Sequence, residues 1–287
     1  MEAKTLQEKL DSHLLWFDTR EGTKADFSGA ILRDAILENV FLKYAILEGT
    51  ILAGANLMDA NLEGAALDGA DLRGAFLQIA NLSGAQIKKA LLADADLRGA
   101  NLHWANLSES FLEKANFHKA DLSWANLKKA VLYGASFEEA NLAGAHLVGA
   151  NLKRANIKGA NLNGTNFMEA CLEGANLEGV SLRETVGNER EIFSRVLNYF
   201  HVVWCGSVIQ IGSKQLTQKE WESLSLADVV ALEEKMEGFF KWWMKYRNSI
   251  LDKSKKMMET CSGNGNVLKG GYTALLGSGS ALTGDKK

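Results

Sequence analysis

One five-residue phrase runs without a break from residue 25 to residue 184, and it constrains the fold more than any other feature of the chain. The phrase reads alanine, then asparagine or aspartate, then leucine, then two variable residues. A Leu, Phe or Ile occupies every fifth position from Phe27 to Leu182, which gives 32 successive matches. The residue two positions earlier is Ala in 27 of these 32 cases. A register this strict predicts a repeat architecture.

The period of five matches neither regular secondary structure. A helix brings residues to one face at a spacing of about 3.6, and a strand does so at a spacing of 2. The phrase instead fits a short inward alternation, with Ala and Leu inside and Asn outside, followed by a change of chain direction. That pattern is typical of a β-solenoid with short faces. We therefore expect the Leu, Phe and Ile series to fill the axis of a rod.

The repeat block resembles the pentapeptide-repeat family, and the resemblance extends over all of residues 25–184. It implies a mainly β fold, namely a right-handed quadrilateral β-helix in which four faces make one coil. A coil then holds four repeats, and the block has eight coils. At about 4.8 Å between stacked strands, the rod is on the order of 40 Å long.

The outward residues support the four-repeat coil independently of the resemblance. We took the residue directly before each Leu, Phe or Ile of the series and grouped those that are four repeats apart. One such column is mostly apolar: Ile31, Ile51, Leu91, Phe111, Val131 and Cys171. Asp71 and Asn151 interrupt it. A second column is almost purely polar, with Phe41, Asn61, Asn81, Asn101, Asp121, Asn141, Asn161 and Ser181. Trp104 and Trp124 are also four repeats apart, and we expect them to stack.

Residues 1–24 are predicted to form a capping helix and a linker. The sequence Thr5-Leu6-Gln7-Glu8 is a capping box, and apolar side chains recur at helical spacing at Leu6, Leu10, His13, Leu14 and Phe17. An open solenoid end exposes core and strand edges, so a cap is needed there. We interpret His13 and Trp16 as packing residues of this helix.

The first coils carry apolar residues in outward positions where later coils carry Asn, at Ile31, Ile36, Phe41, Ile46 and Ile51. Apolar side chains in such number usually mark a covered surface. Two alternatives are open: another chain covers this face, or the C-terminal domain of the same chain does.

Residues 185–260 lose the phrase and are predicted to form a small α+β or helical domain. A hairpin is expected between Val202 and Gly212, with its turn near Cys205-Gly206. A capping box opens a short helix at residues 217–220, and a long helix should run from residue 225 to about 258. The sequences Ile211-Gly212, Glu220-Trp221 and Trp242-Trp243 resemble the tail module of phage and prophage pentapeptide-repeat proteins, in which the position of Ser213 is usually Cys. Residues 261–287 form a Gly/Ser-rich tail with apolar islands, one of which contains Tyr272, Leu275 and Leu276.

Composition and motif spacing exclude several classes of function. The chain has 32 basic and 35 acidic residues, a net charge of −3, so we expect no direct binding of nucleic acid. The three cysteines have no Cys-x-x-Cys spacing, which indicates free thiols in a reducing compartment. The sequence has no apolar run of about 18 residues and no signal peptide, which favours the cytoplasm or a phage particle over a membrane. The five histidines are not at metal-ligand spacings, so we predict no catalytic, cofactor or metal site.

The sequence therefore predicts a non-enzymatic protein-binding or assembly scaffold, a homo-oligomer or part of a larger assembly such as a phage particle. The candidate interface residues lie in the rod, the C-terminal domain and the tail: Ile31, Ile51, Leu91, Phe111, Val131, Trp104, Trp124, Trp242, Trp243, Tyr272, Leu275 and Leu276. The alternative is a DNA mimic that binds DNA gyrase, as the resemblance implies for some family members. Such a rod needs a strongly acidic face, whereas residues 24–184 hold 15 basic and 19 acidic residues.

Overall fold

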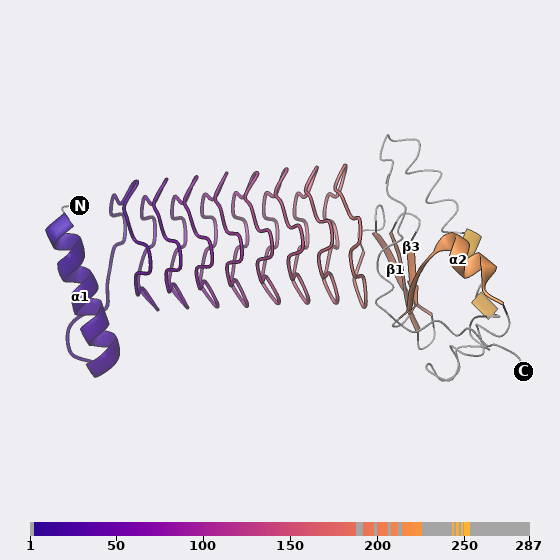
Figure 1. The fold of residues 1–287 in the computed structure, drawn as a ribbon, viewed down its shortest axis with the longest axis horizontal. Coiled ribbons are helices and arrows are strands. Elements are labelled where there is room, and N and C mark those ends of the chain that lie inside the picture. The colour runs from indigo at the N-terminus through magenta and orange to yellow at the C-terminus, as the bar shows by residue number, and fades with distance from the viewer. Residues whose placement is uncertain are drawn as a thin grey trace, which may run out of the picture.

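The computed structural model describes residues 3–187, 192–197, 200–205, 208–211, 214–225, 243, 245, 246, 248 and 250–252. Helix α1 (Ala3–Thr19) comes first and is followed by the repeat block. After the block come strands β1 (Ile192–Leu197), β2 (Phe200–Cys205), β3 (Val208–Ile211) and β4 (Lys214–Thr217), and then helix α2 (Gln218–Ser223). Figure 1 shows α1 at one end of a row of stacked coils and the β1–β4 sheet at the other.

The repeat block winds into coils of four repeats each. Each residue before the Leu series forms a parallel β-bridge with its counterpart four repeats further on, from Asp26–Ile46 to Asn166–Val186. Four five-residue faces therefore complete one coil, and the 32 repeats make eight coils. This confirms the coil length that the outward columns predicted, and no bridge departs from this register within the described residues.

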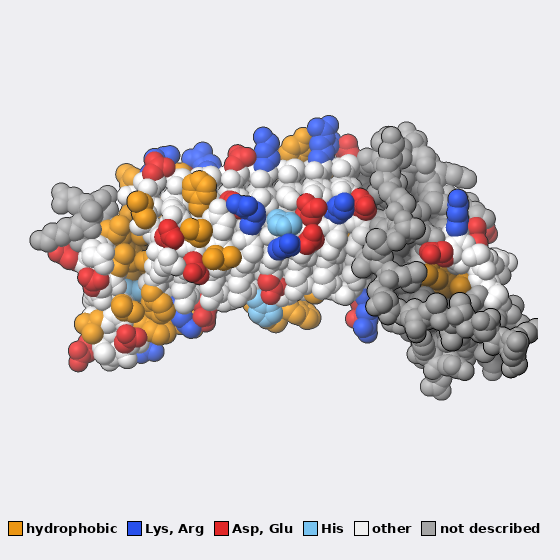
Figure 2. All heavy atoms as spheres, viewed as in Figure 1, with side chains coloured by type: hydrophobic (Ala, Val, Ile, Leu, Met, Phe, Trp, Pro, Cys, Tyr) orange, Lys and Arg blue, Asp and Glu red, His pale blue; other side chains and the backbone are white. Residues whose placement is uncertain are grey.

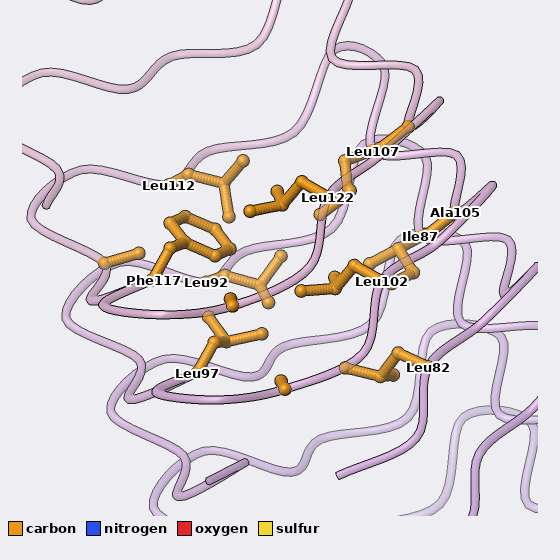
Figure 3. Close-up of a cluster of buried hydrophobic side chains, with 14 of the residues drawn as sticks. Leu82, Ile87, Leu92, Leu97, Leu102, Ala105, Leu107, Leu112, Phe117 and Leu122 are labelled. Carbon is orange, nitrogen blue, oxygen red and sulfur yellow. The ribbon is translucent and has the colours of Figure 1, made fainter. Parts of the chain in front are cut away.

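The interior of the rod is a continuous column of apolar side chains (Figure 3). Every member of the Leu, Phe and Ile series is buried, as the sequence predicted. Phe117 and Phe137, one coil apart, stack with ring centroids 4.8 Å apart and planes 4° from parallel. Where a hydroxyl replaces the inward Ala it is buried too, and Thr50 donates a 2.8 Å hydrogen bond to the Phe27 carbonyl. The polar substitutions in the core are therefore satisfied.

Every face ends in the same tight turn. The amide three residues after the Leu series returns to its carbonyl, as in the 2.8 Å bond from Ala30 to Phe27. The second residue after each Leu has a φ between +54° and +70° throughout the block, which is the geometry of a type II turn. Seventeen of these positions are not glycine, so the left-handed conformation was not evident from the sequence.

Glycine at this corner also provides room for side chains of the preceding coil. The ring of Tyr44 lies over Gly64, and a Cβ added to Gly64 would lie 2.5 Å from it. The indole of Trp124 covers Gly144 in the same way, at 2.7 Å from an added Cβ. A large side chain at the corner thus extends over the next coil, where a glycine leaves room for it.

Many of the outward Asn and Asp residues bind the backbone of their own turn. The side-chain oxygen of Asn61, for example, accepts the amide of Glu63 at 3.1 Å. Several of these side chains also bond between coils, and Asn101 donates to Asn81 at 3.2 Å. The regular Asn positions are therefore occupied by structural hydrogen bonds.

Helix α1 lies across the first coil. Its Leu6 and Leu10 pack against the core of the rod, and Lys9 donates a 2.6 Å bond to the Asp26 carbonyl. His13 is fully buried, and its Nδ1 accepts the amide of Ala25 at 3.1 Å. In the inner coils such backbone groups bond to the neighbouring coil or to their own turn. Here side chains of α1 provide the partners.

The C-terminal strands form an antiparallel sheet in the order β1-β2-β3-β4. Strands β2 and β3 form a hairpin in which Cys205 pairs with Val208, at the turn expected from the sequence. Ile192 of β1 is fully buried and belongs to the core of the rod. Most of the predicted long helix and all of the tail lie outside the described residues. None of the described helices is long and apolar enough to cross a bilayer.

Candidate protein-binding surfaces

Two faces of the rod carry features that the regular repeat does not require. We call the first the apolar column; it consists of Ile31, Ile51, Leu91, Phe111, Val131 and Cys171. These residues are joined by successive parallel bridges through Asp71 and Asn151, so they form one line along the rod. The second face holds a cluster around Trp104 and Trp124, described below. The columns read from the sequence are therefore columns in space.

The apolar column is partly exposed over its whole length. Ile31 exposes 61% of its surface and Phe111 44%, while Ile51, Leu91, Val131 and Cys171 are half-buried. The interruption at Asp71 is internally neutralised because Arg73 forms two side-chain hydrogen bonds to this carboxylate, at 2.8 and 2.7 Å. These bonds hold the pKa of Asp71 below its usual range. The column therefore presents an apolar line without an unpaired charge.

The apolar residues of the first coils differ in whether helix α1 covers them. Phe41 is half-buried under α1, where Phe17 meets it edge to face at 4.8 Å. Ile36, in contrast, exposes 83% of its surface. The described C-terminal strands lie at the opposite end of the rod (Figure 1), so they do not cover Ile31 or Ile36. Within the described residues the C-terminal region does not cover this face, and coverage by another chain stays a prediction.

Trp104 and Trp124 stack as predicted, with ring centroids 5.6 Å apart and planes 9° from parallel. They expose 60% and 50% of their surfaces. Both hold left-handed corner positions, with φ of +58° and +59°. Other residues without glycine share this conformation at the corners, so it is the exposure of two large indole rings that the repeat itself does not require.

A hydrogen-bonded chain of polar side chains adjoins the tryptophan pair. Ser123 donates its hydroxyl to Asp121 at 2.6 Å, and His103 Nδ1 lies 2.7 Å from the same hydroxyl oxygen. The His103 ring meets Trp104 edge to face at 5.9 Å. We call these five residues, His103, Trp104, Asp121, Ser123 and Trp124, the tryptophan patch. The stacking of the tryptophans and the polar column that contains Asp121 were predicted from the sequence, whereas His103 and Ser123, which directly follow a Leu, belong to neither.

Ser123, His103 and Asp121 are not arranged as a catalytic triad. In a triad the histidine lies between the serine and the carboxylate and accepts the serine proton. Here the serine lies in the middle and its proton is directed at the carboxylate. Ser123 is also buried. The described residues contain no group of three His, Cys, Asp or Glu side chains suited to a metal ion.

Charged side chains on the rod are of mixed sign and pair between coils. Lys43 bonds Glu63 at 2.8 Å, and Lys153 bonds Glu173 at 3.0 Å. The bond to Glu63 raises the pKa of Lys43. Figure 2 shows basic and acidic side chains interspersed along the visible face. On this visible face the charges do not form the continuous acidic surface that a mimic of duplex DNA needs.

The remaining candidate residues lie in the C-terminal region. Trp243 is buried and packs against the equally buried Trp221, with ring centroids 5.0 Å apart. Its assignment to a protein interface therefore needs correction, because its side chain is used in packing. The other four candidates lie outside the described residues: Trp242, Tyr272, Leu275 and Leu276.

Comparison with known proteins gives a family match over the rod. The family model described as pentapeptide repeats matches in overlapping segments, at residues 35–74, 55–94, 75–113, 95–134, 130–168 and 145–184. No curated protein matches the chain.

Solved structures also match over the rod. HetL from the cyanobacterium Nostoc sp. strain PCC 7120, a pentapeptide repeat protein involved in heterocyst differentiation regulation, is 33% identical, and the match covers 58% of this chain and 84% of HetL at a TM-score of 0.28. QnrB1, a plasmid-mediated fluoroquinolone resistance protein, is 17% identical, with 58% and 93% of the two chains covered and a TM-score of 0.43.

Proposed function

Because the chain belongs to the pentapeptide-repeat family, we propose that it is a non-enzymatic scaffold whose rigid rod binds other protein chains along the apolar column. Proteins of this family fold as right-handed quadrilateral β-helices and are generally scaffold or binding proteins without catalysis. The proposal includes self-association, as a homo-oligomer or as part of a larger assembly.

The observation that carries this proposal is the apolar column itself. Asn or Asp occupies the equivalent outward slots on most of the rod, whereas this column has six apolar residues in eight positions. Burying an exposed Ile or Phe side chain contributes about 1.5–3 kcal/mol. A line of such residues on a rod that does not deform can bind a partner while ordering little backbone.

The two ends of the rod favour lateral contacts over end-to-end stacking. We propose that α1 caps the first coil, since Lys9 and His13 bond its backbone. Ile192 lies in the core at the other end, which supports the same role for β1. A solenoid with free ends presents strand edges that pair with another chain. With both ends occupied, the lateral faces are the surfaces left for association.

The experiment that tests the column replaces Ile31 and Phe111 together by Asn, the residue that equivalent slots already accept. The mass is measured by size-exclusion chromatography with light scattering. We expect the wild-type chain to have a multiple of its 31.3 kDa mass and the double variant to fall to one chain. Phe76→Asn, the same change on another face, is the matched control and should leave the mass unchanged. A wild-type protein with the mass of a single chain would contradict self-association through the column.

The alternative function, binding of DNA gyrase as a DNA mimic, has less support because acidic side chains such as Glu63 and Glu173 are paired with lysines of the preceding coil. A supercoiling assay with and without a quinolone tests it directly. We expect the chain to change neither the supercoiling rate nor the inhibition by the quinolone. Protection of gyrase at a stoichiometric concentration would reverse the order of the two proposals.

A further inference from the structure

We propose that the tryptophan patch is a docking site for an arginine side chain of a partner protein. This inference rests on the proposed scaffold function and assigns it a second surface and a recognition chemistry. It does not depend on the apolar column, which lies on a different face of the rod.

The hydrogen bonds within the patch have a defined direction. The Ser123 hydroxyl donates to a carboxylate oxygen of Asp121, and the two oxygens lie 2.6 Å apart. The Ser123 oxygen can then only accept from His103, which places the histidine proton on Nδ1. In the neutral form of the imidazole, Nε2 then carries a lone pair. The imidazole, the carboxylate and the indole rings therefore form an electron-rich surface.

This face of the rod carries a negative charge without a positive charge beside it in its own outward positions. From Asn81 to Asn163, the positions of this face before and after each Leu carry a single formal charge, that of Asp121. Within the described part of the chain, Asp121 forms no ion pair with Lys or Arg. A negative group without a cation attracts one from a partner.

Several other aromatic residues of the chain contact a cation of the chain itself. Near the N-terminus, Arg20 lies over the Trp16 ring at 5.1 Å and Lys43 lies over Tyr44 at 5.3 Å. No such cation of the described residues lies over Trp104 or Trp124. The largest exposed aromatic pair of the rod thus lacks the contact that other aromatic groups obtain within the chain.

Space is available beside the pair. The corner column that holds both tryptophans has glycine at 64 and 84 on one side and at 144 and 164 on the other. A Cβ added to Gly84 would meet no atom within 4 Å. A side chain from a partner can therefore lie against Trp104 on the Gly84 side, while Trp124 is backed by Gly144.

Arginine fits this surface better than lysine. Its guanidinium group is planar and stacks on an indole, and its fork of N–H donors also matches a carboxylate. Arginine therefore matches both kinds of group in the patch, the indole faces and the carboxylate. Lysine supplies a compact charge that is strongly hydrated and does not stack.

The test uses a capped peptide, acetyl-Gly-Arg-Gly-Arg-Gly-amide, and its citrulline analogue, which has the same shape without the charge. Binding is followed on the indole N–H signals of the seven tryptophans in ¹⁵N NMR spectra of the full chain. We expect the arginine peptide to shift two signals saturably, those lost in Trp104→Gly and Trp124→Gly. The citrulline peptide should bind at least tenfold more weakly. Equal shifts from both peptides, or no saturable shift, would overturn the proposal.

The variants are chosen so that the rod folds. Glycine already occupies four positions of the same corner column, and Asn already occupies the slot of Asp121 in five other coils. Asp121→Asn should weaken the arginine peptide at least threefold, and unchanged binding would remove the carboxylate from the site. Trp104→Gly should leave the mass of the wild-type assembly unchanged. A fall to one chain would assign the patch to self-association and overturn the proposal.

The Ile31→Asn/Phe111→Asn variant separates the two proposals. It should bind the arginine peptide as the wild type does, because the column and the patch lie on different faces. If the peptide does not bind but this variant still dissociates the assembly, the scaffold function holds and the patch proposal fails. If the peptide binds and the mass is insensitive to the column, the reverse is true.

Discussion

The inner coils and the N-terminal end of the rod satisfy the same backbone groups by different means. In an inner coil, the amide and carbonyl groups bond to adjacent coils or to the local turn, as from Leu102 to Asp121 at 2.7 Å. At the N-terminal end, Lys9 and His13 of α1 supply the partners through their side chains. The backbone of an inner coil is thus stabilised by hydrogen bonds to neighbouring repeats, whereas the N-terminal end depends on a few specific side chains of α1. The two regions should respond differently to mutation and to pH.

The largest effect is expected from a charge inside an inner coil. Leu102→Asp puts a carboxylate in the fully buried axis of the rod without a partner. A buried unpaired charge of this kind costs more than about 4 kcal/mol, so the variant should unfold. Circular dichroism and thermal melting measure the loss. Asn101→Asp is the control, because Asp already occupies equivalent outward slots, and its melting temperature should stay within a few degrees of the wild type.

The corner of an inner coil should respond less strongly. Gly144→Ala adds a methyl group 2.7 Å from the Trp124 ring at a φ of +69°. Gly69→Ala has nearly the same φ, +67°, but no atom within 4 Å of the new methyl group. We expect a loss of about 1–2 kcal/mol at Gly69 from the backbone alone and a further loss of about 1–3 kcal/mol at Gly144. Equal losses in urea unfolding would mean that Trp124 moves aside freely.

The N-terminal end should respond to pH. Burial lowers the pKa of His13, the charge of Lys24 lowers it further, and the Lys43 carbonyl partly opposes this. A histidine with a lowered pKa binds its proton more readily when α1 is detached. The contribution of His13 to the docking free energy of α1 is therefore fully present above about pH 6.5. It is lost as the pH falls toward the folded-state pKa, by up to about 1.4 kcal/mol per pH unit.

Hydrogen exchange of the α1 amides between pH 7.5 and pH 5 measures this loss, after correction for the intrinsic pH dependence of exchange. The inner coils should keep their protection over the same range. His13→Gln removes the titrating group and should make the protection of α1 independent of pH. Protection that falls in parallel in α1 and in the inner coils would instead indicate global acid unfolding.

The smallest effect is expected from ion pairs on the outside of the coils. Lys119 and Glu139 approach to 3.5 Å, and both side chains are more than half exposed. Such pairs contribute less than about 1 kcal/mol. Lys119→Gln should therefore leave the unfolding midpoint in urea nearly unchanged at physiological salt. A loss above about 1 kcal/mol would show that the outer charges act as a network.

The interior of the rod was predictable from the sequence because one period fixes every buried position. The corner conformation was not, since residues such as Ile79 and Trp104 occupy left-handed positions that sequence patterns associate with glycine. The bond between His103 and Ser123 joins two consecutive coils and could have been found by sampling the residues after each Leu. The burial of Trp243 could not, because a tryptophan in an aromatic-rich helix fits a core and an interface equally well.

The constant spacing of four repeats between bridge partners makes the rod a molecular ruler. Adding or removing four repeats would change the separation of α1 and the β1–β4 sheet by one coil, about 4.8 Å, and leave every face aligned with itself. Adding or removing a single repeat would instead turn the sheet by a quarter of a revolution relative to α1. The number of whole coils therefore sets the separation of the two ends, and the number of additional single repeats sets their relative orientation.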